Sequence, residues 1–314
     1  MSGAESSSFS FENKNALVTG ASKGLGEQIA LELLQRGVHV IGASRTGPPE
    51  SFQPYIEQVQ ADYELGDLAR EGDRVISEIY DKHHGYEIFV NNAGAFSPDY
   101  FTHLDPAKIR GDIELDLITP LLLHHSWFDL YNKFHPSAKT PELSVNICSI
   151  SSFYAWPGGT AYQAAKTGLG AAIYGLRSMQ QHLNEQATDE VKQQVGPSAD
   201  LATRIVAIYP DNVATGLLSR AGQESLYKVQ GDALPPDIVV QTVMKAIEGQ
   251  GKFSEYDDVA ILVNPNEPGS RKRLRGVYLG FIPADEETHR PNFSNRILEK
   301  IAEEDVLIKR EADS

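Results

Sequence analysis

A glycine-rich turn near the start of the chain constrains the fold more than any other feature. Residues 15–19 are mostly apolar and predict a short strand that leads directly into this turn. After the turn, apolar residues recur at helical spacing up to Gly37. Glycines let a backbone pass close to a pyrophosphate, and the free amides at a helix start point at the anion. The predicted nucleotide site comprises Gly20, Ser22, Lys23, Gly24, Leu25 and Gly26.

Strands and helices alternate along the residues that follow. Apolar runs at 38–43 and 88–90 predict two more strands, residues 59–62 are expected to end a further strand between them, and residues 67–83 have the spacing of an amphipathic helix. This alternation predicts an α/β fold of three layers, a doubly wound parallel sheet of the Rossmann type, whose ligand crevice lies at the carboxyl ends of the strands. We expect Asp62 to accept from the adenine amino group of a dinucleotide. The residues expected beside its ribose are Asn92, Ala93 and Gly94.

The end of the second predicted strand indicates which dinucleotide binds. A chain that binds NAD usually has an acidic residue there for the ribose 2′-hydroxyl, whereas a 2′-phosphate calls for cations. This chain has Ser44 and Arg45 at that place, and Lys23 is able to approach the same phosphate. We therefore predict NADP(H) as the cofactor. The alternative is that Arg45 is a solvated loop residue.

A tyrosine and a lysine four residues apart carry the predicted chemistry. Tyr162 and Lys166 lie in a segment that favours helix, so their side chains should emerge on one face. A nearby cation favours the phenolate and lowers the tyrosine pKa toward the working range. Ser149 follows a predicted buried strand and is placed to donate a hydrogen bond to the oxygen that Tyr162 protonates. Taken alone, the pair also fits an exposed helical face.

These motifs, in this order and spacing, resemble those of the single-domain short-chain dehydrogenase/reductase family. The resemblance covers about residues 12–220 and rests on Thr19-Gly-x-x-x-Gly-x-Gly, Asn91-Asn-Ala-Gly, Ser149 and Tyr162-x-x-x-Lys166. It implies hydride transfer between a nicotinamide and a carbonyl or alcohol. In that reaction, Tyr162 is the proton donor, Ser149 polarises the carbonyl, and Lys166 holds the nicotinamide ribose. It also implies a nicotinamide loop formed by Pro210, Val213 and Thr215.

Two positions depart from the family's pattern. Asp116 stands where the family has an asparagine, whose main-chain carbonyl holds a water in the proton relay to the lysine. If only the backbone matters, aspartate suffices; otherwise its charge binds Lys166 and alters the titration of Tyr162. Our hypothesis is that the relay survives. The second departure is Asp211, which replaces the glycine of a Pro-Gly turn and costs backbone freedom.

Aromatic and apolar residues near the motifs indicate the class of substrate. The predicted pocket wall comprises Phe96, Phe153, Tyr154, Trp156, Leu217 and Leu218. Such walls suit a hydrophobic or aromatic ketone or aldehyde rather than a sugar, unless the same residues form core. We predict an NADPH-dependent carbonyl reductase. The alternatives are an NADP-binding sensor or scaffold without redox activity, and a biosynthetic enzyme that uses the pocket for a non-redox step.

Composition and charge argue against several other classes of protein. The chain has 43 acidic and 28 basic residues, and its formal charge of −15 disfavours nucleic acid and anionic membranes. A single cysteine, Cys148, excludes an intramolecular disulfide and indicates a reducing, cytoplasmic location. No run of about 18 apolar residues is present to span a bilayer. No metal site is expected, because His124 and His125 have no acidic or cysteine partner at ligand spacing.

The chain is expected to form one domain with extensions. Residues 1–10 are small and polar and predict a disordered tail, and residues 11–265 should form the α/β domain. Within it, residues 211–232 are expected to form a flap over the substrate. Residues 266–314, which include the basic island from Arg271 to Arg275, should pack on the domain or on a partner subunit. The family resemblance implies a homodimer or homotetramer that acts on a small molecule.

Overall fold

The fold is described from a computed structural model of the 314-residue chain. The structure describes residues 11–134, 143–153, 158–185, 188–190, 204–215, 217, 233–249 and 259–262. Several expectations from the sequence lie outside these residues: the N-terminal tail, Tyr154, Trp156, Leu218, most of the flap, and the C-terminal extension with Arg271 to Arg275.

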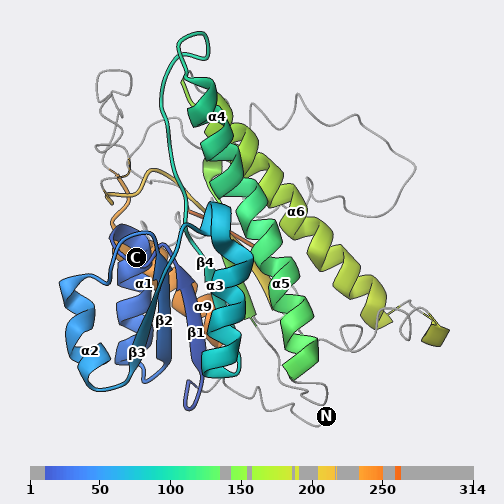
Figure 1. Ribbon diagram of the computed structural model, residues 1–314. Coiled ribbons are helices and arrows are strands. Elements are labelled where there is room, and N and C mark those ends of the chain that lie inside the picture. The colour runs from blue at the N-terminus through green and yellow to red at the C-terminus, as the bar shows by residue number, and fades with distance from the viewer. Residues whose placement is uncertain are drawn as a thin grey trace, which may run out of the picture.

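Seven parallel strands form one sheet in the order β3-β2-β1-β4-β5-β6-β7 (Figure 1). The strands are β1 (Asn15–Thr19), β2 (His39–Ser44), β3 (Ala61–Leu65), β4 (Ile88–Asn91), β5 (Leu143–Ile147), β6 (Arg204–Pro210) and β7 (Val259–Leu262). The first three strands extend toward one edge of the sheet, and the later strands extend toward the other. The order therefore reverses between β1 and β4, which is the doubly wound topology predicted from the sequence.

Helices cover both faces of this sheet (Figure 1). On one face lie α1 (Gly24–Gln35) and α9 (Pro236–Glu248), and on the other lie α3 (Leu68–His83), α5 (Thr119–Phe134) and α6 (Thr160–Glu185). The short elements are η1 (Glu50–Phe52), α2 (Gln53–Glu57), α4 (Pro106–Ile113), η2 (Glu114–Ile118) and η3 (Ile150–Ser152). Within the described part of the chain, no helix combines the length and apolar character needed to cross a membrane.

Alternating strand residues build the two apolar layers between sheet and helices. In β1, Ala16 and Val18 pack toward α1 and α9, whereas Leu17 packs toward α3 and α5 with Trp127. All four residues are fully buried. A fully buried aliphatic side chain contributes about 1.5–3 kcal/mol, so burial on both faces holds β1 at the centre of the sheet. The glycine turn that follows β1 is therefore attached to a strand that is buried on both faces.

A chain of hydrogen bonds links the central strands to α5. Asn91 Nδ2 donates to Asn146 Oδ1 at 3.1 Å, and Asn146 Nδ2 donates to Ser144 Oγ at 3.0 Å. The two ring nitrogens of His124 lie 2.7 Å from Ser144 Oγ and 2.7 Å from the Pro120 carbonyl oxygen. Because a carbonyl only accepts, Nδ1 of His124 carries the proton and Nε2 accepts from the Ser144 hydroxyl. His124 is thus a neutral residue that fixes α5 to β5.

We predict that this buried histidine makes the protein less stable in acid. Burial lowers the pKa of His124 from 6.5 to about 4, so between these values the unfolded chain binds a proton that the folded chain does not. The free energy of unfolding should therefore fall by up to about 3 kcal/mol as the pH drops through this window. Urea unfolding at a series of pH values measures the slope. His124→Gln should lose this part of the pH dependence of stability, and His125→Gln, at the exposed neighbouring position, should keep it. Equal pH dependence in the wild type and His124→Gln would contradict the prediction.

Candidate active site

Ser149, Tyr162 and Lys166 come together where β5 ends and α6 begins. Ser149 lies just beyond β5, and the other two residues lie in the first two turns of α6. The Tyr162 hydroxyl forms a hydrogen bond with Ser149, and Lys166 Nζ lies 5.7 Å from the centre of the Tyr162 ring. Ser149 Oγ also accepts from the Ser151 amide at 3.2 Å and from the Ser151 hydroxyl at 2.8 Å. The proton of the Ser149 hydroxyl is therefore left for Tyr162 or for a bound oxygen.

A buried carboxylate is the counterion of Lys166. Asp116 Oδ1 lies 3.0 Å from Lys166 Nζ, and the two residues are 0% and 5% exposed. Lys166 Nζ also donates to the main-chain carbonyl of Ile147 at 3.2 Å. Of the two alternatives for Asp116, the structure shows the one in which its charge binds Lys166. A buried pair of this kind is stable only while both partners remain, because a single buried charge is very costly.

The electrostatics of Tyr162 differ from the expectation. Burial is the largest influence on its pKa and raises it; Lys166 and the hydrogen bond from Ser149 lower it, and Asp116 raises it further. The net direction is upward, so the expected fall in the Tyr162 pKa is wrong, although Lys166 acts in the predicted sense. Burial also opposes the charge on Lys166, but Asp116 and Tyr162 raise its pKa above the ordinary value, so the ammonium stays charged.

Two carboxylates one helical turn apart hold the loop that follows β4. Asp116 Oδ2 accepts from the Ala95 amide at 2.9 Å. Asp112 accepts from the Ser97 amide at 3.1 Å and from the Ser97 hydroxyl at 2.8 Å. Burial raises the pKa of Asp112. Sequence reasoning missed Asp112, although its i,i+4 spacing from Asp116 placed both carboxylates on one helix face.

Gly94 leaves the space that the Asp116 carboxylate occupies. A Cβ atom at Gly94 would lie 2.6 Å from Asp116 Oδ1 and 3.6 Å from Lys166 Nζ. The first distance is shorter than nonbonded atoms tolerate, and the ion pair has no room to move because it is buried. Gly94 therefore has a packing role beside the ion pair, in addition to the ribose contact expected from the sequence.

Thr19 and Asn92 fix the glycine turn against the end of β4. Thr19 Oγ1 accepts from the amides of Asn92 and Ala93, each at 3.0 Å, and Asn92 Nδ2 donates to the Thr19 carbonyl at 3.0 Å. Gly20 has a φ of +69°, which disfavours any other residue, and a Cβ atom at Gly26 would collide with Gly20 and Asn92. The predicted turn and the predicted ribose segment are thus one interlocked unit.

The start of α1 has free donors for a pyrophosphate. The helix begins at Gly24, and the preceding residue, Lys23, makes no capping hydrogen bond with its side chain. The first amides of the helix therefore have no side-chain acceptor at the cap and point into the crevice. Leu25 and Gly26 are both buried, and the Leu25 side chain anchors this turn in the core. These residues fit the diphosphate of a dinucleotide.

Polar and cationic groups gather where β2 ends. Ser44 Oγ donates to the Thr46 carbonyl at 2.6 Å and lies 2.7 Å from the Tyr63 hydroxyl, which also bonds Ser22. Tyr63 thus connects the end of β2 to the glycine turn, a link that the sequence did not reveal. Lys23 and Arg45 are exposed, and neither has a carboxylate within ion-pair distance among the residues that the structure describes. Both cations are available to an anion.

Asp62 lies at the wrong end of the sheet to contact adenine. β3 runs from Ala61 to Leu65, so Asp62 is near the amino end of the strand, whereas the crevice lies at the carboxyl ends. The expected adenine contact is therefore wrong. The sequence misled because Asp62 and Glu64 are charged and do not look like strand residues, whereas this edge strand continues to Leu65. Leu65, at the carboxyl end of β3, is 57% exposed.

Three of the predicted pocket residues, Phe96, Phe153 and Leu217, lie in the described part of the chain, and their surroundings differ. Phe96 packs edge-on against Tyr162, with ring centres 5.1 Å apart. Phe153 is buried against Tyr209, with ring centres 4.8 Å apart, in the apolar layer under α6. Phe153 is therefore core, so its predicted place in the pocket wall is wrong. Leu217 is 37% exposed.

The loop after β6 is ordered by short hydrogen bonds. Pro210 ends β6, and Val213 forms an isolated bridge with Leu234. The Thr215 amide donates to the Val213 carbonyl at 2.7 Å, and Asp211 Oδ1 accepts from the Asn212 amide at 2.8 Å. The backbone of Asp211 does not have a positive φ, so an aspartate in place of glycine imposes no strain here.

Known proteins resemble the chain in sequence and in fold. The family model described as short chain dehydrogenase matches residues 14–224. The 3-oxoacyl-[acyl-carrier-protein] reductase FabG of Buchnera aphidicola is 30% identical over 162 residues, which cover 50% of this chain and 64% of that protein. The benzil reductase ((S)-benzoin forming) of Bacillus subtilis is 30% identical over 155 residues, 49% of this chain and 62% of that protein. The matched regions thus span less than two thirds of these two relatives.

Solved structures agree on the fold. A 3-oxoacyl-[acyl-carrier protein] reductase from Brucella melitensis, in complex with NAD, has a TM-score of 0.63 at 18% identity over 79% of this chain and 94% of its own. A short chain dehydrogenase from Burkholderia cenocepacia, in complex with NADP, has a TM-score of 0.59 at 18% identity over 81% and 90%. The family match extends from β1 past β6 and includes the glycine turn and the start of α6. The chain belongs to the short-chain dehydrogenase family.

Proposed function

We propose that the protein is an NADPH-dependent reductase that transfers hydride to a ketone or aldehyde of hydrophobic or aromatic character. The observation that carries the proposal is the Tyr162 hydroxyl, which is bonded to Ser149 and lies beside a charged Lys166. This arrangement supplies one proton donor and one further hydrogen-bond donor to a single carbonyl oxygen. Two preorganised donors stabilise the charge that develops on that oxygen more than they stabilise the ground state.

The chain's own residues account for the proton side of this reaction. NADPH, when bound, supplies the hydride that reaches the carbonyl carbon, and the electron pair of the C=O bond moves to oxygen. That oxygen takes the proton of the Tyr162 hydroxyl, and Ser149 donates to it. The raised pKa of Tyr162 keeps the phenol protonated at neutral pH, which is the form that reduction requires. The Lys166 ammonium stabilises the phenolate that remains.

We infer that the proton that returns to Tyr162 passes through Lys166 and a water held by the main-chain carbonyl of Asp116. In an α-helix, the amide of residue 120 would donate to the carbonyl of residue 116, but Pro120 has no N–H. The helix here widens into the π-helical turn η2, which contains Asp116. The Asp116 carbonyl thus lacks its ordinary helical donor and is suited to hold a water. We infer that Asp116 has both roles: its backbone serves the relay and its side chain binds Lys166.

Free cations at the end of β2 support NADP(H) rather than NAD(H). Ser44 occupies the end of β2, where a chain that binds NAD usually has an acidic residue for the ribose 2′-hydroxyl. Arg45 and Lys23 are exposed, and neither has a carboxylate partner in the described chain. Phe96 at the Tyr162 ring supports an apolar substrate, as does the similarity to the benzil reductase of Bacillus subtilis. A cytoplasmic location and a homodimeric or homotetrameric state stay predictions.

The proposed activity is tested with NADPH and a panel of aromatic ketones and aldehydes, following the loss of NADPH absorbance and the formation of the alcohol. We expect Tyr162→Phe to lower kcat by about 100-fold or more while NADPH binding persists, because a general acid is lost. Tyr174→Phe, on an exposed part of α6, is the control. Full activity in Tyr162→Phe would defeat the mechanism. NADPH binding without turnover would favour a sensor, and conversion without NADPH consumption would favour a non-redox enzyme.

The cofactor preference is tested at Arg45. We expect Arg45→Ala to raise the KM for NADPH by about 10- to 100-fold, because a charge-assisted hydrogen bond contributes about 1.5–3 kcal/mol, and to leave the KM for NADH unchanged. Arg70→Ala removes an arginine whose side chain is 85% exposed and serves as the control. Steady-state kinetics with the two cofactors measure the effect. An equal change for NADPH and NADH would show that Arg45 does not contact the 2′-phosphate.

A further inference from the structure

Two histidines and an aspartate meet at the end of the sheet opposite to the candidate active site. His39 is the first residue of β2, Asp62 is the second residue of β3, and His83 is the last residue of α3. The glycine turn and Ser149 lie at the carboxyl ends of the strands, so this cluster takes no part in the site described above. Three separate elements contribute one side chain each.

The three side chains have the separations of metal ligands. His39 Nε2 lies 3.2 Å from Asp62 Oδ2, and His83 Nδ1 lies 3.8 Å from the same oxygen. All the potential ligand atoms lie within 4.8 Å of one another. Zinc–ligand bonds of about 2.0–2.1 Å place tetrahedral ligand atoms about 3.3 Å apart. The cluster therefore needs only small side-chain adjustments to surround one ion.

The histidines are in a state that favours binding a metal. A neutral imidazole ring has a lone pair that a metal ion can accept. The Nε2 atoms of both His39 and His83 are shielded from solvent and form no well-aligned hydrogen bond among the described residues; His39 Nε2 only approaches Asp62 Oδ2, at 3.2 Å. Buried polar atoms are normally satisfied, so each ring has capacity that the protein itself does not use. The side chain of Asp62 is 27% exposed, which leaves a path for an ion to enter.

Lys82 is the cation that competes for this place. Its Nζ lies 2.8 Å from Asp62 Oδ1 and 3.3 Å from Glu64 Oε1. Asp62 thus offers one oxygen to Lys82 and the other to the histidines. The Lys82 side chain is 52% exposed, so it can turn toward Glu64 or solvent when a dication occupies the cluster. Its charge nevertheless repels a metal ion and should weaken binding.

We propose that His39, Asp62 and His83 bind one zinc-type divalent ion, with a water as the fourth ligand. Two imidazoles and one carboxylate form a ligand set that zinc commonly takes when one position stays open. An ion bound there would link β2, β3 and the end of α3, in addition to the strand pairing and the apolar packing that already join them. The site would stabilise the fold, and it lies too far along the strands to contact the carbonyl that Tyr162 protonates.

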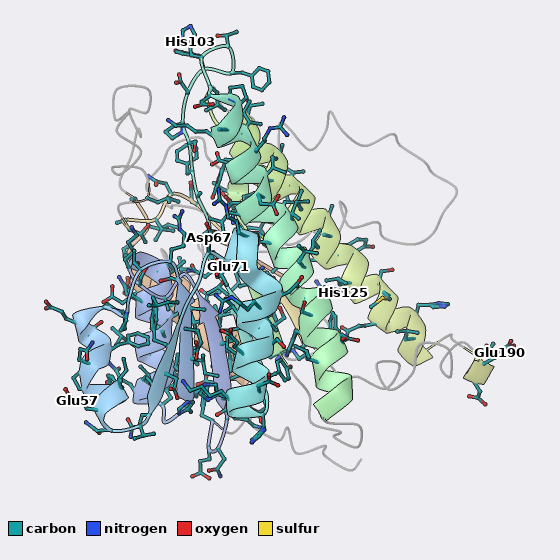
Figure 2. The ribbon with its side chains drawn as sticks, viewed as in Figure 1. Glu57, Asp67, Glu71, His103, His125 and Glu190 are labelled. Atoms are coloured by element: carbon teal, nitrogen blue, oxygen red, sulfur yellow. The ribbon has the colours of Figure 1, made fainter. Side chains whose placement is uncertain are left out.

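The experiment uses the tag-free full-length protein after treatment with a chelator. Calorimetry with Zn²⁺ and absorption spectroscopy with Co²⁺ should each show one equivalent bound, with the Co²⁺ bands of a tetrahedral site. Zn²⁺ at about 100 times its Kd should raise Tm by on the order of 5 °C. His39→Gln and His83→Gln should each lose the stoichiometric binding. Figure 2 shows the control positions, His103 in the loop that precedes α4 and His125 on α5; both are exposed and their Gln variants should bind as the wild type does.

A second variant guards against a loss that reflects misfolding. Lys82→Gln removes the competing charge and should bind Zn²⁺ about tenfold more tightly, a gain that an unfolded protein cannot produce. The proposal is overturned if no stoichiometric binding occurs, if the two ligand variants bind as well as the two controls, or if Lys82→Gln binds Zn²⁺ no better than the wild type.

Discussion

The ion pair between Asp116 and Lys166 is the interaction on which the candidate active site depends. Asp116 Oδ1 and Lys166 Nζ lie 3.0 Å apart, and both side chains are almost wholly buried. Removal of either partner would therefore leave an uncompensated buried charge. Its carboxylate also holds the Ala95 amide, and its ammonium also holds the Ile147 carbonyl. One pair therefore connects the ends of β4 and β5 to the start of α6, where Tyr162 lies.

The surrounding residues are explained by the space and charge that this pair requires. Gly94 has no Cβ because the carboxylate occupies that volume. Pro120 opens the helix next to Asp116, and Asp112 fixes the same loop one turn earlier. The nucleotide turn is joined to this assembly through Asn92, which bonds the main chain of Thr19. Tyr162, its charged neighbours and the glycine turn are thus joined in one hydrogen-bonded unit at the switch point of the sheet.

The sequence predicted what depends on local pattern and family spacing: the doubly wound sheet, the glycine turn, and the meeting of Ser149, Tyr162 and Lys166. It failed where tertiary burial decides. The Tyr162 pKa rises because desolvation outweighs Lys166, which no spacing reveals. Asp62 was misplaced because an edge strand tolerates charged residues, and Phe153 is core because α6 covers it. The proposed metal ligands come from distant elements, so no sequence motif marks them.

The pKa of Tyr162 is the measurement that tests the central claim most directly. Nuclear magnetic resonance of protein with ¹³C-labelled tyrosine, with Tyr162→Phe used to assign the signal, follows this ionisation. We predict a pKa above the ordinary 10.0 in the wild type. Asp116→Asn should lower it by removing a buried negative charge, whereas Asp112→Asn, which does not touch Lys166, should leave it nearly unchanged. A wild-type value below 10.0, or equal values in the wild type and Asp116→Asn, would contradict the account.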